Sequence, residues 1–538
     1  MEKVMRGQWR NTLTMSAKDV GVNRRSTILM LTLTILIGAI LRVYDIGTES
    51  IWNDEVSGIF LSTKDITKII KYAGPTQSNP PLYFIILHYW IGLFGMSEGA
   101  TRSLSAIFGI ISILLIYQVG VLLFNTRVGL LSSFLSSISI FHIHYSQEAR
   151  GYSLLLLLSL LSYLFFIKIL EEDKKGDYLY YFITNTVLGY THFYGLIIIA
   201  SQVFFFVFFW GKYRFKRIKF LITLAGIIIA LLPLALILRK RMKWLVKAGF
   251  WLTEPDFLSI IYTLKTFSGD GLGSPILLLM FLILLLIGFV SFTKLGGKWV
   301  WKSPLKSLKN FTIAIKFNSI EKQLLLVMWL SFSIIIPFIE SKFMTPIYLT
   351  RYMIGASPAF LLLVAKGMST ITKKKILYST LIFVILLSGL GLRDYYVNFI
   401  HPQWREVVSF VKIHCKEESD VAIISPSVDQ IAFDYYYKGE LKRVGMNHHL
   451  SGIEEISNFV NDASREKVRV WLIFTQDIRR INIFGPYCCV MPRPNREEIS
   501  RKNTELVGYL MNRYGNKAIQ LDKQFFRIQV LLLNLSTP

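Results

Sequence analysis

Two adjacent carboxylates, Asp54 and Glu55, stand beside Trp52 in the loop that follows the first long apolar segment. Neighbouring residues point in different directions on a helix or an extended loop, so the two carboxylates are not expected to share one proton. A carboxylate that faces a cavity can accept a proton from an incoming hydroxyl and act as a general base. The structural alternative is an acidic cap on a helix that starts after Asn53, or a solvated loop. The pattern makes Asp54 and Glu55 candidate catalytic residues.

Cationic and imidazole side chains lie in other short polar segments between apolar runs. Arginine suits phosphate because its planar guanidinium donates several hydrogen bonds at once. Burying an ionisable group at the depth of the membrane costs free energy, so a functional role is the first interpretation of such a group. Each of these groups also has a simpler structural explanation. Glu148 can form an ion pair with Arg150, either histidine can form a structural hydrogen bond, and Arg351 can snorkel toward the membrane surface. The candidate binding residues are His144, Glu148, Arg150, His192, Lys240, Arg241, Arg351 and Tyr352.

The elements that must position these residues have the composition of a membrane protein. The 538 residues are 53% hydrophobic with a mean hydropathy of +0.46, whereas soluble domains are about 45–50% apolar. Apolar runs of roughly 15–20 residues recur from Thr27 to about Leu392, which is typical of spanning helices. The shorter run Pro81–Gly95 is expected to form a helix at the membrane interface. About eleven spans are predicted, near residues 27–44, 103–123, 128–143, 153–170, 178–192, 195–210, 219–238, 275–293, 323–340, 352–368 and 376–392.

The formal net charge of +25 has an explanation in membrane topology. Lysine and arginine collect in cytoplasmic loops, so the charge does not indicate nucleic-acid binding. The basic segment 1–25 predicts a cytoplasmic N-terminus, and counting spans from it places the polar segments on the external face of the plasma membrane. The basic segment 239–243 is expected on that face as a loop, which is unusual. Either it binds anionic headgroups or phosphates, or the topology shifts by one span there.

Two parts are therefore predicted: a polytopic helical membrane domain over residues 1–395, and an extracytoplasmic α/β domain over residues 396–538. The catalytic loop is expected at about residues 45–102, on the external side. In the tail, helical patterns alternate with short buried strands, which is typical of a small layered sheet. The tail contains no Gly-rich phosphate loop, no nucleophile elbow and no zinc-ligand spacing. The expected helices are 404–415, 429–437 and 496–514, and the expected strands are 421–425, 468–474 and 525–533.

Six polar motifs follow one another along the first 395 residues. They are Trp52-Asn53-Asp54-Glu55, Asn79-Pro80-Pro81-Leu82-Tyr83, Phe94-Gly95 with Glu98 and Arg102, His144-Tyr145-Ser146-Gln147-Glu148-Ala149-Arg150-Gly151-Tyr152, Tyr190-Thr191-His192-Phe193-Tyr194-Gly195 and Arg351-Tyr352. Taken together and in order, these motifs resemble the C-type (GT-C) glycosyltransferase family, in particular its protein O-mannosyltransferase and lipid A aminoarabinose transferase branch. The resemblance covers about residues 1–395. It implies inverting transfer of a mannose-like sugar from a polyprenyl- or dolichyl-phosphate donor to a hydroxyl on the outer face of the membrane.

The resemblance also implies roles for the candidate residues. Asp54 is the base that deprotonates the acceptor hydroxyl, and Glu55 binds the acceptor or orients the loop. A phosphate leaving group needs no acid but is stabilised by cations. The residues assigned to the donor phosphate or sugar are Arg150, Arg351, Lys240 or Arg241, His144, His192, Glu148 and Tyr352.

Two features separate the chain from relatives in that family. It lacks the Asp-x-Asp metal pair of the oligosaccharyltransferase branch, so no obligatory divalent ion is expected, and whether one binds stays open. Its tail does not resemble the sugar-binding repeats of eukaryotic O-mannosyltransferases, which leaves protein, lipid and glycan as acceptors. Two other functions compete with this one. A transporter or flippase of lipid-linked sugars would show broken helices at mid-membrane depth, and a glycan polymerase or ligase would share the lipid-phosphate leaving group.

Overall fold

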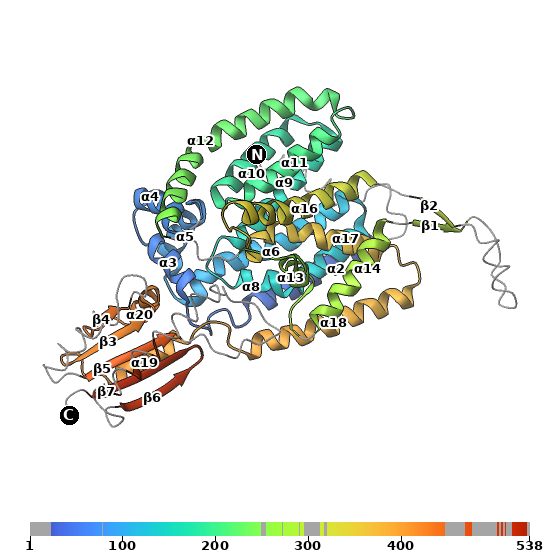
Figure 1. The fold of residues 1–538 in the computed structure, drawn as a ribbon. Coiled ribbons are helices and arrows are strands. Elements are labelled where there is room, and N and C mark those ends of the chain that lie inside the picture. Colours follow the sequence, from blue (N-terminus) through green and yellow to red (C-terminus); the bar gives the residue numbers. More distant parts are fainter. Residues whose placement is uncertain are drawn as a thin grey trace.

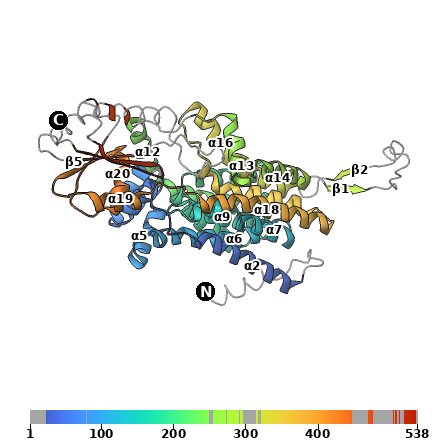
Figure 2. The same ribbon diagram turned by 90° about the horizontal axis from the view of Figure 1, so that it is seen from below.

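Long helices lie side by side along most of the molecule, and a five-stranded sheet lies at one end of them (Figures 1 and 2). A two-stranded hairpin, β1 (Ser291–Lys294) with β2 (Ile313–Lys316), lies at the opposite end. This computed structural model describes residues 23–77, 79–248, 254–271, 273–289, 291–294, 313–316, 320–446, 469–475 and 519–534, with short pieces between 503 and 512.

The helical part combines long helices with shorter ones that pack between them. Three short helices lie between α2 and α6: α3 (Asn53–Ser62), α4 (Ile66–Gln77) and α5 (Leu82–Phe94). The long helices are α2 (Arg24–Val43), α6 (Glu98–Leu123), α9 (Tyr152–Glu172), α12 (Arg217–Ala248), α16 (Ile320–Phe343) and α18 (Lys374–Val397). The others are α7 (Thr126–Ser137), α8 (Ile140–Ser146), α10 (Lys175–Thr191), α11 (Tyr194–Phe208), α13 (Phe257–Ser268), α14 (Ser274–Phe289), α17 (Ser357–Ser369) and the 3-10 helices η1 (Arg214–Lys216) and η2 (Thr350–Ala356).

The predicted multi-pass helical architecture is confirmed, whereas the count of eleven spans is not. Within the described residues, seven helices are long and apolar enough to cross a membrane, or eight if the bent pair α7–α8 is one span. The other three predicted spans are helices too, but α10, α11 and α14 have only 17, 15 and 16 residues. Crossing the hydrocarbon core takes about 20 residues, so these three helices are too short to be counted as spans by their length.

The predicted span 128–143 is broken into α7 and α8, which meet at an angle of 59°. The buried guanidinium of Arg42 on α2 donates to the backbone oxygens of Gly38 and Ser136 at 3.0 Å and of Ser137 at 3.1 Å. The last carbonyls of a helix have no intrahelical partner, so a cation there satisfies them. Arg42 thereby stabilises the end of α7, where the chain turns toward the polar segment 144–150.

The basic segment 239–243 is not a loop, contrary to the expectation from the sequence. Helix α12 continues past Leu238 to Ala248, with Pro233 inside it. Lysine and arginine are good helix formers, and residues 239–248 contain no glycine or proline that would end the helix earlier. The last part of α12 packs beside α4, as Figure 1 shows.

The C-terminal sheet has the strand order β4-β3-β5-β7-β6, with β3 parallel to β4 and β5, and β7 antiparallel to β5 and β6. Most of the predicted elements of the tail are present, and the predicted helix 496–514 lies mostly outside the described residues. β4 and β6 were not predicted because these edge strands are only partly buried and lack an apolar run. The elements are α19 (Trp404–His414), β3 (Asp420–Ser425), η3 (Ser427–Asp429), α20 (Gln430–Tyr436), β4 (Lys442–Gly445), β5 (Arg469–Thr475), β6 (Ile519–Phe525) and β7 (Ile528–Asn534).

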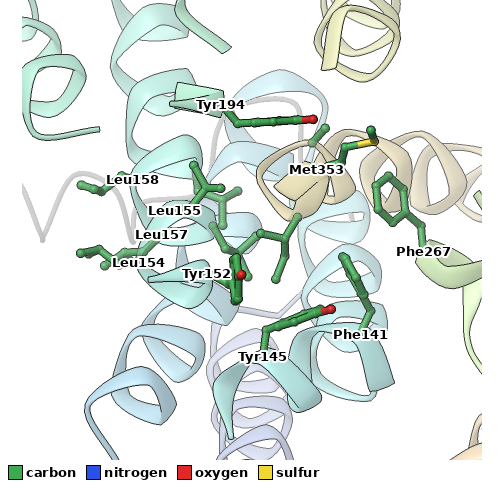
Figure 3. Packing of buried hydrophobic residues seen from close by; sticks show 14 of the residues in the cluster. Phe141, Tyr145, Tyr152, Leu154, Leu155, Leu157, Leu158, Tyr194, Phe267 and Met353 are labelled. Atoms are coloured by element: carbon green, nitrogen blue, oxygen red, sulfur yellow. The ribbon is translucent and has the colours of Figure 1, made fainter. Parts of the chain in front are cut away.

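The core of the helical part surrounds the first turns of α9. Figure 3 shows Tyr152 at the start of this helix among Tyr145, Phe141 and Tyr194, next to the leucines of α9. Leu155 and Leu156 are fully buried, and so is Tyr152. This packing fixes the direction in which the chain leaves the polar segment before α9.

Gly367 lets α17 approach α14 closely, because a Cβ atom there would lie 1.8 Å from the backbone oxygen of Leu284. We expect Gly367→Ala to lower the free energy of unfolding by about 1–3 kcal/mol, since only separation of the two helices makes room. Gly389→Ala on α18 is the matched control, because a Cβ there meets nothing within 4 Å. It is expected to be neutral or to stabilise by up to ~1 kcal/mol. Thermal unfolding in detergent measures both, and equal melting temperatures would contradict the close approach.

Candidate active site

Asp54 and Glu55 occupy the first turn of α3, after the N-cap residue Trp52. Acidic side chains suit this position because the backbone N–H groups at a helix N-terminus carry partial positive charge. The two carboxylates point in different directions, as predicted: Glu55 is fully buried, whereas the side chain of Asp54 is 32% exposed. A capping role accounts for the acids themselves but not for the buried cations around them.

Two arginines hold Asp54. Nη1 of Arg351 lies 3.0 Å from Oδ2 of Asp54, and Nη1 of Arg150 donates to the backbone oxygen of Asp54 at 3.0 Å. Both guanidinium groups are buried, Arg150 in the loop between α8 and α9 and Arg351 in η2. The guanidinium of Arg150 also lies 5.8 Å from the ring centre of Phe84 on α5. The structure thus brings together one acid and two cations that the sequence analysis assigned to one site.

Glu55 is engaged in a different contact. Its Oε1 and Oε2 accept hydrogen bonds from Nε and Nη2 of Arg102 at 2.8 and 2.7 Å, and Oε1 also accepts from the Ala149 amide at 2.8 Å. The other N–H groups of Arg102 donate to the backbone oxygens of Ile46, Glu49 and Ser50. All five guanidinium donors are therefore used. Of the two roles that the resemblance implied for Glu55, this geometry fits orientation of the loop.

Glu148 faces two imidazoles rather than Arg150. Its Oε1 lies 3.3 Å from Nε2 of His144 and 3.9 Å from Nε2 of His401, and all three side chains are buried. Nδ1 of His401 lies 2.5 Å from Oε2 of Glu49, and the Ile400 amide donates to Oε1 of Glu49 at 2.6 Å. The ring of His401 stacks on Trp52 with centroids 5.4 Å apart. This cluster joins the segment after α18 to the start of α3.

The cluster sets the charge of its members. Burial alone lowers the pKa of His401, but the carboxylates of Glu49 and Glu148 outweigh burial and raise this pKa to about 10. Burial likewise raises the pKa of the Glu148 carboxyl, but the hydrogen bonds and charges of His144 and His401 outweigh it and hold this pKa well below its usual range. The protonated His401 therefore lies between two carboxylates at neutral pH.

His192 and Tyr352 lie in an aromatic group beside the two arginines. The ring of Tyr352 lies 5.0 Å from that of His192, 5.4 Å from that of Tyr194 and 6.2 Å from that of Tyr152. The guanidinium of Arg351 lies 5.6 Å from the Tyr352 ring centre. Both residues therefore belong to the same site as Asp54.

The predicted pair Lys240 and Arg241 is only partly placed. Arg241 is buried on α12. Desolvation lowers the pKa of its guanidinium, and the smaller opposing effect of the neighbouring Tyr352 does not restore the ordinary value. The side chain of Lys240 lies outside the described residues. Arg241 therefore lies near Tyr352 and adds a cation from α12 to the surroundings of the aromatic group.

Helical elements that lie beside the C-terminal sheet in the sequence contact the start of α3 and the residues immediately before it. The Ile51 amide donates to the hydroxyl oxygen of Tyr436 at 2.7 Å, and the hydroxyl of Ser50 donates to Glu406 at 3.1 Å. The amide of Asn53 donates to the carboxylate of Asp429. Helices α19 and α20 thus hold the segment that presents Asp54.

Sequence reasoning assigned no site role to Arg102, Glu49 or His401. Arg102 carries a weak signal, because it belongs to a motif of the family resemblance and is a lone arginine just before a long apolar segment. His401 carries none that points to Glu148, since these two residues are separated by nearly half of the chain. Within the described residues, no group of three or more His, Cys, Asp or Glu side chains is placed to hold a metal ion.

The fold and the site together define a multi-pass membrane protein with an ion-paired carboxylate among buried arginines. Residues 78–253 match the family model of dolichyl-phosphate-mannose-protein mannosyltransferases. ArnT from Cupriavidus metallidurans is similar in fold, with a TM-score of 0.56 and 10% identity, over 95% of this chain and 98% of that chain. Its structure bound to undecaprenyl phosphate gives a TM-score of 0.55 at 10% identity, over 96% of this chain and 100% of that chain.

An oligosaccharyltransferase from Archaeoglobus fulgidus gives a TM-score of 0.47 at 12% identity, over 83% of this chain and 68% of that chain. None of the curated proteins matches this chain. The chain has the GT-C glycosyltransferase fold, and the resemblance to the GT-C family stated from the sequence is confirmed.

Arg102→Ala is expected to destabilise the protein by about 3–5 kcal/mol, because it leaves the buried carboxylate of Glu55 without its cation. Combining Glu55→Gln with Arg102→Met removes both charges and is expected to cost clearly less. Arg405→Ala is the matched control, because Arg405 is 36% exposed and pairs with Glu98 at 3.4 Å beside the same loop. Exposed pairs contribute at most about 1 kcal/mol. Chemical unfolding measures these three variants together with Glu55→Gln alone and Arg102→Met alone. A double variant whose cost equals the sum of the two single costs would contradict the coupling.

His401 is expected to give the protein a measurable alkaline instability. Its folded pKa of about 10 lies above the unfolded value of about 6.5, so its stabilising contribution is complete below about pH 6.5 and is lost as the pH rises toward 10. The melting temperature of the wild type should therefore fall more steeply between about pH 7 and 10 than that of His401→Gln. His414→Gln, an exposed histidine on α19, should follow the wild type. Parallel curves for wild type and His401→Gln would contradict this assignment.

Proposed function

We propose that this chain is an inverting glycosyltransferase that moves a mannose-like sugar from a polyprenyl-phosphate donor to a hydroxyl acceptor. The observation that carries the proposal is the position of Asp54: a partly exposed carboxylate at a helix N-terminus, with one buried arginine on its side chain and another on its backbone. A base that meets an acceptor must be reachable from solvent, whereas groups that stabilise a leaving anion act best where water is excluded. Asp54, Arg150 and Arg351 satisfy both conditions within one site.

The reaction follows from these positions. Asp54 takes the proton of the acceptor hydroxyl, whose oxygen attacks the anomeric carbon from the face opposite the phosphate. The bond between the anomeric carbon and the phosphate oxygen breaks, and the lipid phosphate leaves with the electron pair, which inverts the configuration. Arg150 and Arg351 stabilise the charge that develops on the phosphate. Glu55 keeps α3 in place through Arg102 and takes no part in proton transfer.

The comparisons support the choice of donor. The matching family is described by dolichyl-phosphate mannose, and ArnT, which shares the fold over nearly the whole chain, binds undecaprenyl phosphate. Protein, lipid and glycan hydroxyls are the acceptor classes that we retain. Residues 1–395 form the membrane part of this enzyme in the plasma membrane, and residues 396–538 form a domain that lies outside the cytoplasm beside the acceptor. The N-terminus is cytoplasmic in this arrangement.

A transporter or flippase of lipid-linked sugars is the second candidate, because α7 and α8 form a broken span. The guanidinium of Arg42 on α2 lies at the break and donates there to the backbone oxygens of Ser136 and Ser137. The contacts of that guanidinium account for the break without a transported substrate. A glycan polymerase or ligase shares the chemistry above and differs in the acceptor alone.

Asp54→Asn is expected to lower sugar transfer at least about hundredfold, because the amide cannot accept the acceptor proton. Purified protein is incubated with radiolabelled polyprenyl-phosphate mannose and cell-envelope acceptors, and labelled product is counted. Binding of the donor lipid is expected to remain. Asp65→Asn is the matched control: Asp65 lies before α4 with a half-exposed side chain and bonds only to neighbouring residues. Transport of the donor lipid across vesicles without glycosidic product would instead support the flippase.

A further inference from the structure

The buried polar atoms that have no hydrogen-bond partner within the described part of the chain include two beside the arginines of the site: the hydroxyl of Tyr152 and Nε2 of His192. Tyr152 is 0% exposed and His192 is 2% exposed. Buried polar groups are nearly always paired in proteins, so each exception calls for an explanation. Both groups are close to one another, since their ring centroids are 6.2 Å apart.

The two side chains converge on the arginines of the site. Tyr152 follows Arg150 by two residues and opens α9, where Figure 3 shows its ring within the aromatic core. The guanidinium of Arg351 lies 5.7 Å from the ring centre of Tyr152. Burial, and then the positive charges of Arg150 and Arg351, lower the pKa of His192 to about 3. The imidazole of His192 is therefore neutral, and it lies within the electrostatic influence of both arginines.

The hydrogen bond at the other ring nitrogen determines where the His192 proton lies. The Tyr194 amide donates to Nδ1 of His192 at 3.1 Å. A nitrogen that accepts a hydrogen bond carries no proton in the neutral ring, so the proton is on Nε2. Nε2 is a hydrogen-bond donor and cannot act as a base.

We propose that the Tyr152 hydroxyl and the His192 Nε2–H are the neutral half of a phosphate site whose charged half is Arg150 and Arg351. This inference rests on the proposed function and names the groups that bind the donor phosphate. Arginine and the Nε2–H group of His192 only donate, and a tyrosine hydroxyl can donate. A group of donors fits the non-bridging oxygens of a phosphate, which only accept, better than a sugar hydroxyl, which must also donate. Neutral donors also add hydrogen bonds without further repulsion between cations.

The test measures binding of undecaprenyl phosphate to the purified full-length chain in detergent, with undecaprenol as the arm that lacks phosphate. Tyr152→Phe and His192→Asn are each expected to raise the Kd for undecaprenyl phosphate by about tenfold or more, as loss of a hydrogen bond to a charged group does. Their affinity for undecaprenol should not change. Asparagine keeps an acceptor for the Tyr194 amide and loses the distal donor.

His192→Gln is the conservative variant, because its amide nitrogen can take the place of Nε2, and it is expected to bind nearly as the wild type does. Two matched controls remove the same chemistry elsewhere: Tyr163→Phe on α9, whose hydroxyl bonds to Ser201 at 2.6 Å, and His142→Asn, whose ring nitrogens bond to Ser136 and Ser357. Both should retain the wild-type Kd. Melting temperatures confirm that each variant is folded.

Unchanged Kd values in Tyr152→Phe and His192→Asn would overturn the inference. So would an equal loss in His192→Gln and His192→Asn, because that result indicates a purely structural role for the ring. If Tyr152→Phe does not fold, the two His192 variants decide. Failure of the proposed function looks different: the wild type would bind undecaprenyl phosphate with these residue effects and yet transfer no sugar from any polyprenyl-phosphate donor.

Discussion

The buried pair of Arg102 and Glu55 is the interaction on which the rest of the site depends. Its two hydrogen bonds join α6 to α3, and the remaining donors of Arg102 hold the backbone of residues 46–50. Removing either partner would leave a charge in a place that water does not reach. Because these hydrogen bonds fix the Glu55 side chain, the pair determines the orientation of α3. The partly exposed position of Asp54 follows, because consecutive residues on a helix differ in direction by about 100°.

Asp54 is placed where two environments meet. Its carboxylate is within reach of solvent, whereas Arg351 and Arg150, which contact it, are buried. An anion that enters between the arginines competes with Asp54 for Arg351, since one guanidinium fork serves one partner best. Under the proposed function, a donor phosphate would therefore loosen the ion pair and leave the carboxylate available to an acceptor. This competition would favour binding of the donor before the acceptor.

Much of this arrangement could be predicted from the sequence, and the rest could not, for a physical reason. Every apolar run that was predicted to span the membrane is helical, although the run 128–143 is broken and α13 was not predicted. Residue chemistry and the family resemblance together assigned Asp54, Arg150 and Arg351 to one site. Periodicity cannot show which distant side chains meet, so the pairing of Glu49 with His401 stayed hidden. The prediction of a loop at the basic segment 239–243 was wrong, because a cluster of lysine and arginine does not end a helix and the chain there is helical. The edge strands β4 and β6 escaped because they are barely apolar.

The contact between Glu49 and the segment 400–401 joins residues that are 351 and 352 positions apart. A ribosome makes α3 early and His401 only after the last long helix, α18, has been completed. Until then Glu49 and Glu148 lack the imidazolium that lies between them, and Trp52 lacks the ring on which it stacks. An unfinished chain thus carries Asp54 on a helix that lacks these contacts. They can form only after nearly three quarters of the polypeptide has been synthesised.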